Sequence, residues 1–348
     1  MADRKTKQPQ SVETVRDGVT IDDIAKRANV SKSTVSRVLN GSAVVNQQKQ
    51  DAVHQAVIDL DYTPNMFAQG LASGKSMTLG ILTQNIGSPF YAAIAQGVIE
   101  GLAGSGYTPL FVDGGWDHKR EAVSIEALIS RKVDGLLIVG GDIAASELQS
   151  YEKQMPLIVV ARDINGLERR CVSVNNKQIG YMATKHLLEQ RHTQIAFIHG
   201  IEGHPDAQDR FAGHLEALQE AGISRSDELL YQGDFSGHAG FKAVNYLLDQ
   251  GISFSAIVAA NDMVALGSRL ALYRRGIRVP DDVSIIGCDD QAAAAFMTPP
   301  LTTIRQPSYE MGVVASKALL SSISNEDYEW SELAPELQIR ESVKRFTS

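Results

Sequence analysis

Residues 20–41, TIDDIAKRANVSKSTVSRVLNG, contain two short helical patterns separated by a tight break. The first begins at Thr20, which stands at an N-cap position with an acidic residue three positions later, and its apolar residues recur at helical spacing. The second begins after Ser31 and ends at an Asn-Gly pair, a common helix stop. A third pattern begins at Asn46, so the sequence predicts a three-helix domain over residues 20–64.

The second helical pattern has an apolar and a polar face. Val35, Val38 and Leu39 form the apolar stripe, which we expect to pack on the other two helices. A tightly turned helix pair with a polar outer face is typical of a helix-turn-helix, whose second helix enters the major groove. Arginine can donate two hydrogen bonds to guanine, and short hydroxyl side chains suit phosphate oxygens. The predicted DNA contacts on this helix are Ser31, Lys32, Ser33, Thr34, Ser36 and Arg37.

The charge distribution leaves a second interpretation open, in which the three helices are only a structural subdomain. The net charge of the chain is −8, and residues 1–72 carry nine basic and eight acidic side chains. The head is therefore close to neutral on an acidic body, and DNA binding would depend on where the charges lie.

After residue 76 the sequence alternates between short apolar runs and helical patterns, which predicts parallel sheets covered by helices on both faces. About eight such units in roughly 270 residues favour two doubly wound lobes. The expected strands are 78–83, 108–113, 135–140, 156–161, 195–200, 256–260 and 283–288. The expected helices are 91–105, 119–131, 177–190, 210–221, 236–250 and 262–275.

Several classes of protein are disfavoured by what the sequence lacks. No apolar run approaches the ~20 residues that span a bilayer, and the polar leader, residues 1–19, has no signal-peptide core. We therefore expect a cytoplasmic protein without membrane contact, with Cys171 and Cys288 as buried free thiols. Histidine spacing predicts no metal site, and we expect no cofactor and no enzymatic activity. A solute-binding protein of a transport system remains a disfavoured alternative, because such proteins share the predicted body.

Residues 20 to about 341 resemble the lactose-repressor (LacI) family of bacterial transcription regulators. In the head, the resemblance rests on TIDDIAKRANVS (20–31), VSRVLNG (35–41), YTPN (62–65) and NMFAQGLA (65–72). In the body, it rests on VDGLLIVGG (133–141), DRFAGHLEAL (209–218), AANDMVALG (259–267), VPDDVSIIGCDD (279–290) and PPLTTIRQP (299–307). It implies a helix-turn-helix head and a body like the periplasmic binding proteins, with two α/β lobes.

The resemblance also implies a hinge helix, within a hinge and linker of residues 65–76, that folds only on operator DNA. Eight residues are too few for a stable isolated helix, and Gly70 weakens helicity further. A leucine matching Leu71 would wedge into the minor groove. The family position matching Gln69 is often basic, which predicts a weaker contact here. The remaining DNA contacts implied by the family are Thr20, Asn40, Asn65, Gln69, Leu71 and Ala72.

For the body, residues 77–348, the resemblance implies a small effector between the lobes and a homodimer on a palindromic operator. Sugars suit Asp, Asn and Arg partners together with an aromatic plane, so a sugar or sugar derivative is the favoured effector. A purine or nucleoside acting as co-repressor is the alternative effector, and for each polar residue the alternative is a capping or inter-lobe role. The implied effector contacts are Asn85, Phe90, Tyr91, Trp116, Arg162, Arg210, Phe235, Asn261, Asp289 and Gln306.

Two departures from the family leave the identity of the effector open. Many relatives carry an acidic residue before the arginine that follows the fourth strand, whereas this chain has Ala161-Arg162-Asp163, and Asn175-Asn176 replaces a common Asp-Asn pair. The end of the sequence has no leucine heptads, so we expect no tetramer through such a coil.

Overall fold

The computed structural model describes residues 19–40, 45–62 and 74–347, and these fall into two units that divide between Gly74 and Lys75. The leader, the predicted hinge contacts Asn65, Gln69, Leu71 and Ala72, and the side chain of Asn40 lie outside the described residues.

The head contains the three predicted helices, α1 (Ile21–Ala28), α2 (Lys32–Asn40) and α3 (Gln47–Asp59). Its core is small, with Ile24, Val35 and Val53 fully buried, one from each helix. The predicted apolar stripe of α2 is confirmed, because Val38 and Leu39 pack against this core.

Local hydrogen bonds begin each of the three helices. Thr20 donates from its backbone N–H and its hydroxyl to the Asp23 carboxylate, at 3.0 and 2.7 Å, which confirms the predicted start of α1. The Ser31 hydroxyl accepts from the backbone N–H of Thr34 at 3.2 Å. The side chain of Asn46 caps α3. Such caps satisfy backbone donors that have no partner within the helix.

The first lobe of the body is a parallel five-stranded sheet in the order β2-β1-β3-β4-β5. Its strands are β1 (Thr78–Thr83), β2 (Thr108–Asp113), β3 (Gly135–Val139), β4 (Leu157–Val160) and β5 (Cys171–Val172). Its helices are α5 (Pro89–Gly101), α6 (His118–Ser130), α7 (Ala145–Glu152) and α12 (Ser308–Ile323). Apolar clusters bury both faces of the sheet.

The second lobe is a six-stranded sheet in the order β11-β10-β9-β8-β6-β7, parallel except for β11, which runs antiparallel to β10. Its strands are β6 (Ile195–Ile198), β7 (Leu230–Tyr231), β8 (Ala256–Ala259), β9 (Ser284–Asp289), β10 (Thr302–Arg305) and β11 (Glu336–Gln338). Its helices are α8 (Asn176–Glu189), α9 (Pro205–Glu220), α10 (Gly237–Asp249) and α11 (Asp262–Arg274). Two apolar clusters again cover the two faces, so the predicted pair of doubly wound lobes is confirmed.

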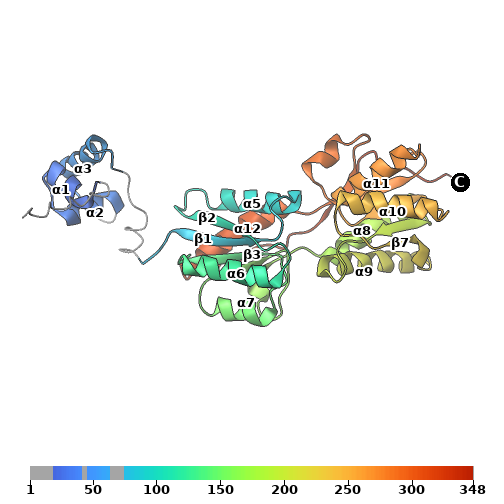
Figure 1. Cartoon of the computed structure of the whole chain (residues 1–348), viewed down its shortest axis with the longest axis horizontal. Coiled ribbons are helices and arrows are strands. Elements are labelled where there is room, and N and C mark those ends of the chain that lie inside the picture. Colours follow the sequence, from blue (N-terminus) through green and yellow to red (C-terminus); the bar gives the residue numbers. More distant parts are fainter. Residues whose placement is uncertain (1–18, 41–44, 63–73, 348) are drawn as a thin grey trace, which may run out of the picture. The chain divides into compact units, whose positions relative to one another are not determined.

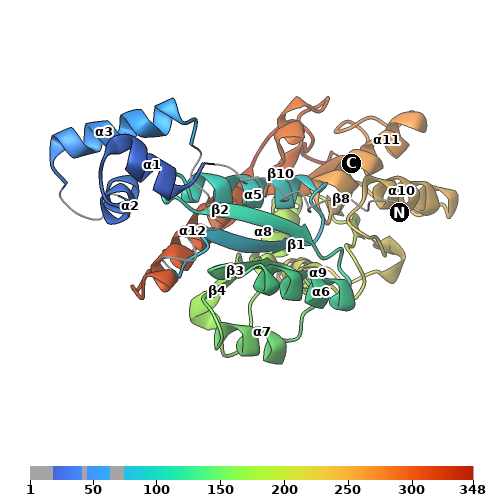
Figure 2. The same cartoon turned by 60° about the vertical axis from the view of Figure 1, so that its left-hand side comes forward.

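The chain crosses between the lobes three times, at residues 173–175, at 306–307 and between α12 and β11. Consequently α12, near the C-terminal end of the sequence, lies beside α5 in the first lobe, as Figures 1 and 2 show. The two helices pack so closely that a Cβ on Gly97 would lie 2.0 Å from the carbonyl oxygen of Tyr309. The three crossings hold the lobes at a common boundary, where their strands end.

Candidate ligand pocket and nucleic-acid interface

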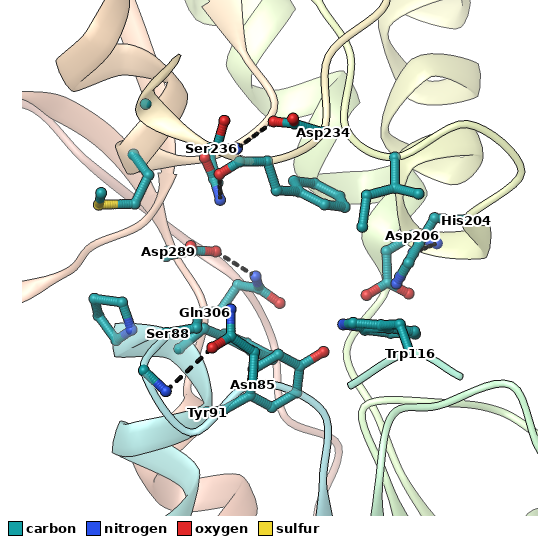
Figure 3. A pocket seen from close by; sticks show the side chains of 18 of the residues that line it. Asn85, Ser88, Tyr91, Trp116, His204, Asp206, Asp234, Ser236, Asp289 and Gln306 are labelled. Carbon is teal, nitrogen blue, oxygen red and sulfur yellow. Dashed lines mark hydrogen bonds between the residues drawn. The ribbon is translucent and has the colours of Figure 1, made fainter. Parts of the chain in front are cut away.

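A cavity of about 330 Å³ lies between the two lobes, at the carboxyl ends of their strands. Parallel α/β sheets bind ligands at this edge, and the volume is at the lower end of the range for ligand pockets. Figure 3 shows side chains from both lobes converging on it. The lining brings together nine of the ten predicted effector contacts, namely Asn85, Phe90, Tyr91, Trp116, Arg210, Phe235, Asn261, Asp289 and Gln306.

The tenth predicted residue, Arg162, is not among the lining residues. Its guanidinium donates to the carbonyl oxygen of Ile143 at 2.8 Å, and it lies in the electrostatic range of Asp142 and Glu121. Burial lowers the pKa of Arg162, and these two acidic groups oppose that shift. The structure therefore places Arg162 in contacts within the first lobe.

Arg210 forms the charged wall of the second lobe, where its side chain is only 5% exposed. It donates to the side-chain oxygen of Asn176 at 2.9 Å and to the carbonyl oxygen of Ala260 at 2.6 Å. Burial lowers its pKa, but acidic groups that include Asp289 and Asp206 outweigh burial and leave it raised. The guanidinium is thus a fixed positive charge between two carboxyl groups.

Asp206 and Asp289 are carboxyl groups with perturbed protonation. Burial raises the pKa of Asp206 to about 6, against the opposing effect of Arg210. Burial also raises the pKa of Asp289, which accepts hydrogen bonds from Gln306 at 2.7 Å and from Gln291 at 3.1 Å. Because Gln306 lies on the second crossing between the lobes, its bond to Asp289 joins the pocket to the lobe boundary.

A row of aromatic rings lines the pocket from one lobe to the other. Ring centroids are 6.3 Å apart for Tyr91 and Trp116, 4.6 Å for Trp116 and His204, and 5.4 Å for His204 and Phe235. Phe235 also lies against the Arg210 guanidinium, at 5.7 Å. Trp116 belongs to the first lobe and His204 to the second, so this row crosses the boundary where the lobes meet.

Three lining residues have left-handed backbone conformations that side chains rarely adopt. Trp116 has φ of 57°, Phe235 of 65° and Asp289 of 113°. Each such conformation costs on the order of 1–3 kcal/mol, and it persists where surrounding contacts hold it. Here the Trp116 backbone N–H donates to Gln84 at 2.9 Å, and Asn261 donates to the carbonyl oxygen of Phe235 at 3.1 Å. Strain of this kind is concentrated at functional sites.

The two predicted asparagines also have structural roles. The side-chain oxygen of Asn261 accepts from the backbone N–H of Val264 at 2.9 Å and so caps α11. The side-chain oxygen of Asn85 accepts from the backbone N–H of Gly87 at 3.1 Å. Each amide therefore has only part of its hydrogen-bonding capacity left for a ligand.

Eight further side chains, which were not predicted from the sequence, also line the pocket: Ser88, Pro89, Ile201, His204, Asp206, Asp234, Ser236 and Met263. His204 and Asp206 stand at the start of α9, where Pro205 occupies the first helical position. The proline was the available signal, because proline at a helix start would have moved the predicted beginning from 210 to 205.

In the head, the polar face of α2 is turned outward. Lys32, Ser33 and Arg37 are exposed, and Thr34 and Ser36 are half-buried. Lys32 forms a surface ion pair with Asp22 at 2.6 Å, and the Ser31 hydroxyl lies 2.8 Å from those of Ser33 and Thr34. This face offers an exposed guanidinium and clustered hydroxyl groups. Thr20 is occupied in the start of α1.

Within residues 19–40, 45–62 and 74–347, no cluster of histidine, cysteine or acidic side chains could hold a metal ion. Among the helices of these same ranges, none combines the length and apolar character needed to cross a membrane.

Two family models match the chain. Residues 20–65 match the model described as bacterial regulatory proteins of the lacI family, and residues 76–339 match periplasmic binding proteins and sugar binding domain of LacI family. The chain is 34% identical to the regulator GalR of Escherichia coli K12, covering 88% of this chain and 90% of GalR. It is 34% identical to the ribose operon repressor of Haemophilus influenzae, with 93% and 98% covered. It is 32% identical to the repressor PurR of Aliivibrio salmonicida, with 94% and 99% covered.

Solved structures agree with this assignment. The lac repressor dimer bound to operator and the anti-inducer ONPF has a TM-score of 0.85 at 26% identity, covering 94% of this chain and 100% of that one. The regulator CelR in complex with cellobiose has a TM-score of 0.69 at 30% identity, with 93% and 99% covered.

Proposed function

The chain belongs to the LacI family of bacterial regulatory proteins, and from this premise we propose how its two units divide the task of a ligand-controlled transcriptional regulator. The head binds operator DNA through the exposed face of α2, as one half of a homodimer on a palindromic site. The body binds a sugar or sugar derivative in the pocket between its lobes, and the bound ligand controls the affinity for operator. The protein works in the cytoplasm and through binding alone, without catalysis.

The pairing of polar and aromatic walls in the pocket is the observation that carries the choice of a sugar. Arg210 and Asp289 offer fixed polar partners for neighbouring hydroxyl groups. Trp116 and Phe235 offer apolar ring faces for the C–H side of a pyranose or furanose. Ligand pockets in general combine apolar walls with a few polar groups that fix orientation.

The exposed face of α2 supports the proposed contact with DNA. Arg37 extends from a helix held by a buried valine, so its guanidinium is free to reach the edge of a guanine. One recognition helix reads only a few base pairs, and a symmetric pair reads a palindrome. The hinge contacts implied by the family, Asn65, Gln69, Leu71 and Ala72, lie outside the described residues and stay predictions.

Control by the ligand follows from the construction of the pocket. Its walls come from both lobes, and the Gln306–Asp289 hydrogen bond and the Trp116–His204 contact lie where they meet. A ligand that binds one relative position of the lobes more tightly shifts the population toward it. We propose that this shift changes how well the two heads of the dimer fit the operator.

The test measures both bindings and their coupling. Ligands are screened by thermal shift on the full chain with galactose, ribose, cellobiose and purine bases, and those that bind are titrated with and without promoter DNA. We expect ligand affinity to change on DNA by the same factor by which the ligand changes DNA affinity. Equal ligand affinities in both titrations would reject the coupling, and failure to select promoter DNA over random DNA would reject the regulator.

A purine or nucleoside is the second candidate. The aromatic row from Tyr91 to Phe235 could stack on a base, while Arg210 and Asp289 could bond to its edge. Binding of guanine or hypoxanthine, with no binding of the sugars in the same screen, would favour this candidate.

A further inference from the structure

The balance of charge in the pocket suggests which form of its ligand can enter. The lining contains three carboxyl side chains, Asp206, Asp234 and Asp289, and a single guanidinium, that of Arg210. Burial and the nearby Arg210 lower the pKa of His204 to about 4, so its imidazole is neutral at physiological pH. An anion in the pocket would meet more negative than positive charge.

Two of the five N–H groups of the Arg210 guanidinium are already used within the protein. It donates to Asn176 and Ala260, and its charge lies within the influence of Asp206 and Asp289. A phosphate group generally requires a cation with free donors, such as an arginine fork. The pocket lining offers no second arginine and no lysine.

Helix N-termini could in principle replace a cation, since their free N–H groups favour anions. Four helices begin at this pocket, and in three of them a side chain already accepts one of the free N–H groups. Asn261 accepts from Val264 in α11, Ser236 from Ala239 in α10, and His204 from Asp206 in α9. The fourth helix, α5, begins with Pro89, which has no N–H at that position.

Asp206 is the carboxylate that lacks a donor. Its side chain points across the pocket at the indole of Trp116, as Figure 3 shows. It accepts no hydrogen bond from any side chain or backbone group in the described part of the chain. A half-buried carboxylate without donors gains most from a ligand that donates to it, such as a hydroxyl, an amine or a ring N–H.

We propose that the pocket selects an unphosphorylated, hydrogen-donating ligand and rejects its phosphorylated counterpart, with Asp206 as the residue that determines this specificity. The inference rests on the proposed function, because it concerns the same pocket. The proposal assigns the protein to sensing a free sugar or nucleoside, that is, the substrate of a kinase or the product of a phosphatase.

The test uses matched pairs of compounds on the full chain. Isothermal titration compares galactose with galactose 1-phosphate, ribose with ribose 5-phosphate, and glucose with glucose 6-phosphate at pH 7.5. We expect the phosphate ester of whichever sugar binds to bind at least tenfold more weakly, because its negative charge would lie beside the carboxylates of the pocket. A phosphate ester that binds as tightly as its parent sugar, or more tightly, overturns the proposal.

Two variants separate the contribution of Asp206 from a general effect of charge. Asp206→Asn is nearly isosteric, and we expect it to weaken the parent sugar about tenfold and to reduce the discrimination against the phosphate ester. Glu220→Gln removes the same charge from an exposed position at the far end of the same helix, and we expect it to change neither. Equal discrimination in Asp206→Asn and the wild type would remove the assigned role of Asp206.

The outcome is distinguishable from failure of the proposed function. A phosphate ester that binds and also changes operator affinity would overturn the inference and leave the regulator intact. A free sugar that binds with the expected selectivity and leaves operator affinity unchanged would support the inference and reject ligand control.

Discussion

Asp206 carries a carboxyl group whose ionisation opposes folding of the unliganded body. An aspartate in an unfolded chain ionises near pH 4, whereas burial raises the pKa of Asp206 to about 6 in the folded state. Arg210 opposes the shift, while Asp209 and Asp163 reinforce it; Asp289 and the neutral His204 share the pocket. A ligand that donates a hydrogen bond to the Asp206 carboxylate would offset this cost of ionisation.

The sign of the resulting pH dependence can be tested with Asp206→Asn. A raised folded-state pKa contributes stability that is complete below about pH 4 and is lost as the pH rises through 6. Asparagine has no such dependence, so we expect the variant to gain on the order of 2 kcal/mol over the wild type between pH 4 and 7.5. Urea unfolding of the unliganded protein at both pH values measures the difference. A gain that is the same at both would show that the carboxyl group is not perturbed.

Phe235 keeps its place because residue 200 has no side chain. A Cβ on Gly200 would lie 2.2 Å from the Phe235 ring, so Gly200→Ala must displace the ring or the backbone. We expect a loss of about 1–3 kcal/mol in the free energy of unfolding and about tenfold weaker binding of the ligand. Chemical denaturation and calorimetric titration measure the two effects.

A second substitution shows whether the ring is the cause. Combining Gly200→Ala with Phe235→Leu provides space for the new methyl group. We expect the double variant to lose less free energy of unfolding than the sum of the losses in the two single variants. Additive losses would mean that the two positions do not interact.

Single side chains of the pocket were predictable where they directly follow a strand or stand in a family motif. Asp289 and Asn261 end apolar runs that are strands in the structure, so the edge of the sheet placed them. Asp206 was not predicted because it lies in the first turn of α9, ahead of the expected start of that helix at residue 210. Arg162 also follows a strand, but the backbone reverses at Ala161, with φ of 57°, and its side chain bonds to Ile143. Hydrophobic periodicity in the sequence does not reveal this change of backbone direction at Ala161.

The α2 helix has a buried side and an exposed side with different roles. Val35 fixes it to the head, and the opposite side carries Arg37. We expect Arg37→Ala to weaken operator binding by about 1–3 kcal/mol, roughly tenfold to a hundredfold, because a bidentate contact with guanine would be lost. Fluorescence anisotropy with labelled promoter DNA measures the change.

The matched control for Arg37 is an exposed arginine of the body. Arg131→Ala removes one positive charge at the end of α6, and we expect operator affinity to stay within twofold of the wild type. An equal loss in both variants would point to bulk charge. Unchanged affinity in Arg37→Ala would remove this residue from the interface.

The elements themselves differ in how readily they could be predicted. Seven strands could be predicted from their apolar runs, because such runs are typical of parallel sheets covered on both sides. The two-residue strands β5 and β7 are too short to form a pattern, and TTIR in β10 mixes polar and apolar residues. The α12 helix was not predicted, nor was its return to the first lobe, which depends on close packing against α5 and which local sequence does not encode.

The body as a whole exposes an apolar surface that a soluble monomer would not be expected to carry. It is formed by Leu266, Leu270 and Tyr273 on α11 together with Phe296 in the short 3₁₀ helix η3 (Ala292–Phe296). Tyr273 is 79% exposed and Phe296 is 87% exposed. Large exposed apolar patches mark protein–protein interfaces, and a twofold dimer places the same patch of both copies together. We therefore predict that this surface lies in the homodimer interface.

A charge at the centre of this surface should separate the two copies. Leu270, which is 46% exposed, faces a hollow shared with Phe296, so Leu270→Glu would place a carboxylate in an apolar contact without a partner. We expect sedimentation velocity at micromolar concentration to show a shift from dimer to monomer, and operator affinity to fall at least tenfold because one head then binds without the other. Val123→Glu, at a 66% exposed position on α6 in the first lobe, makes the same chemical change elsewhere and should stay dimeric with full operator affinity. If the protein stays dimeric with both Leu270→Glu and Phe296→Glu, the two copies meet on another surface. If Leu270→Glu gives a monomer that still binds its ligand but no longer binds operator, this surface is needed to pair the heads and is not needed for the pocket.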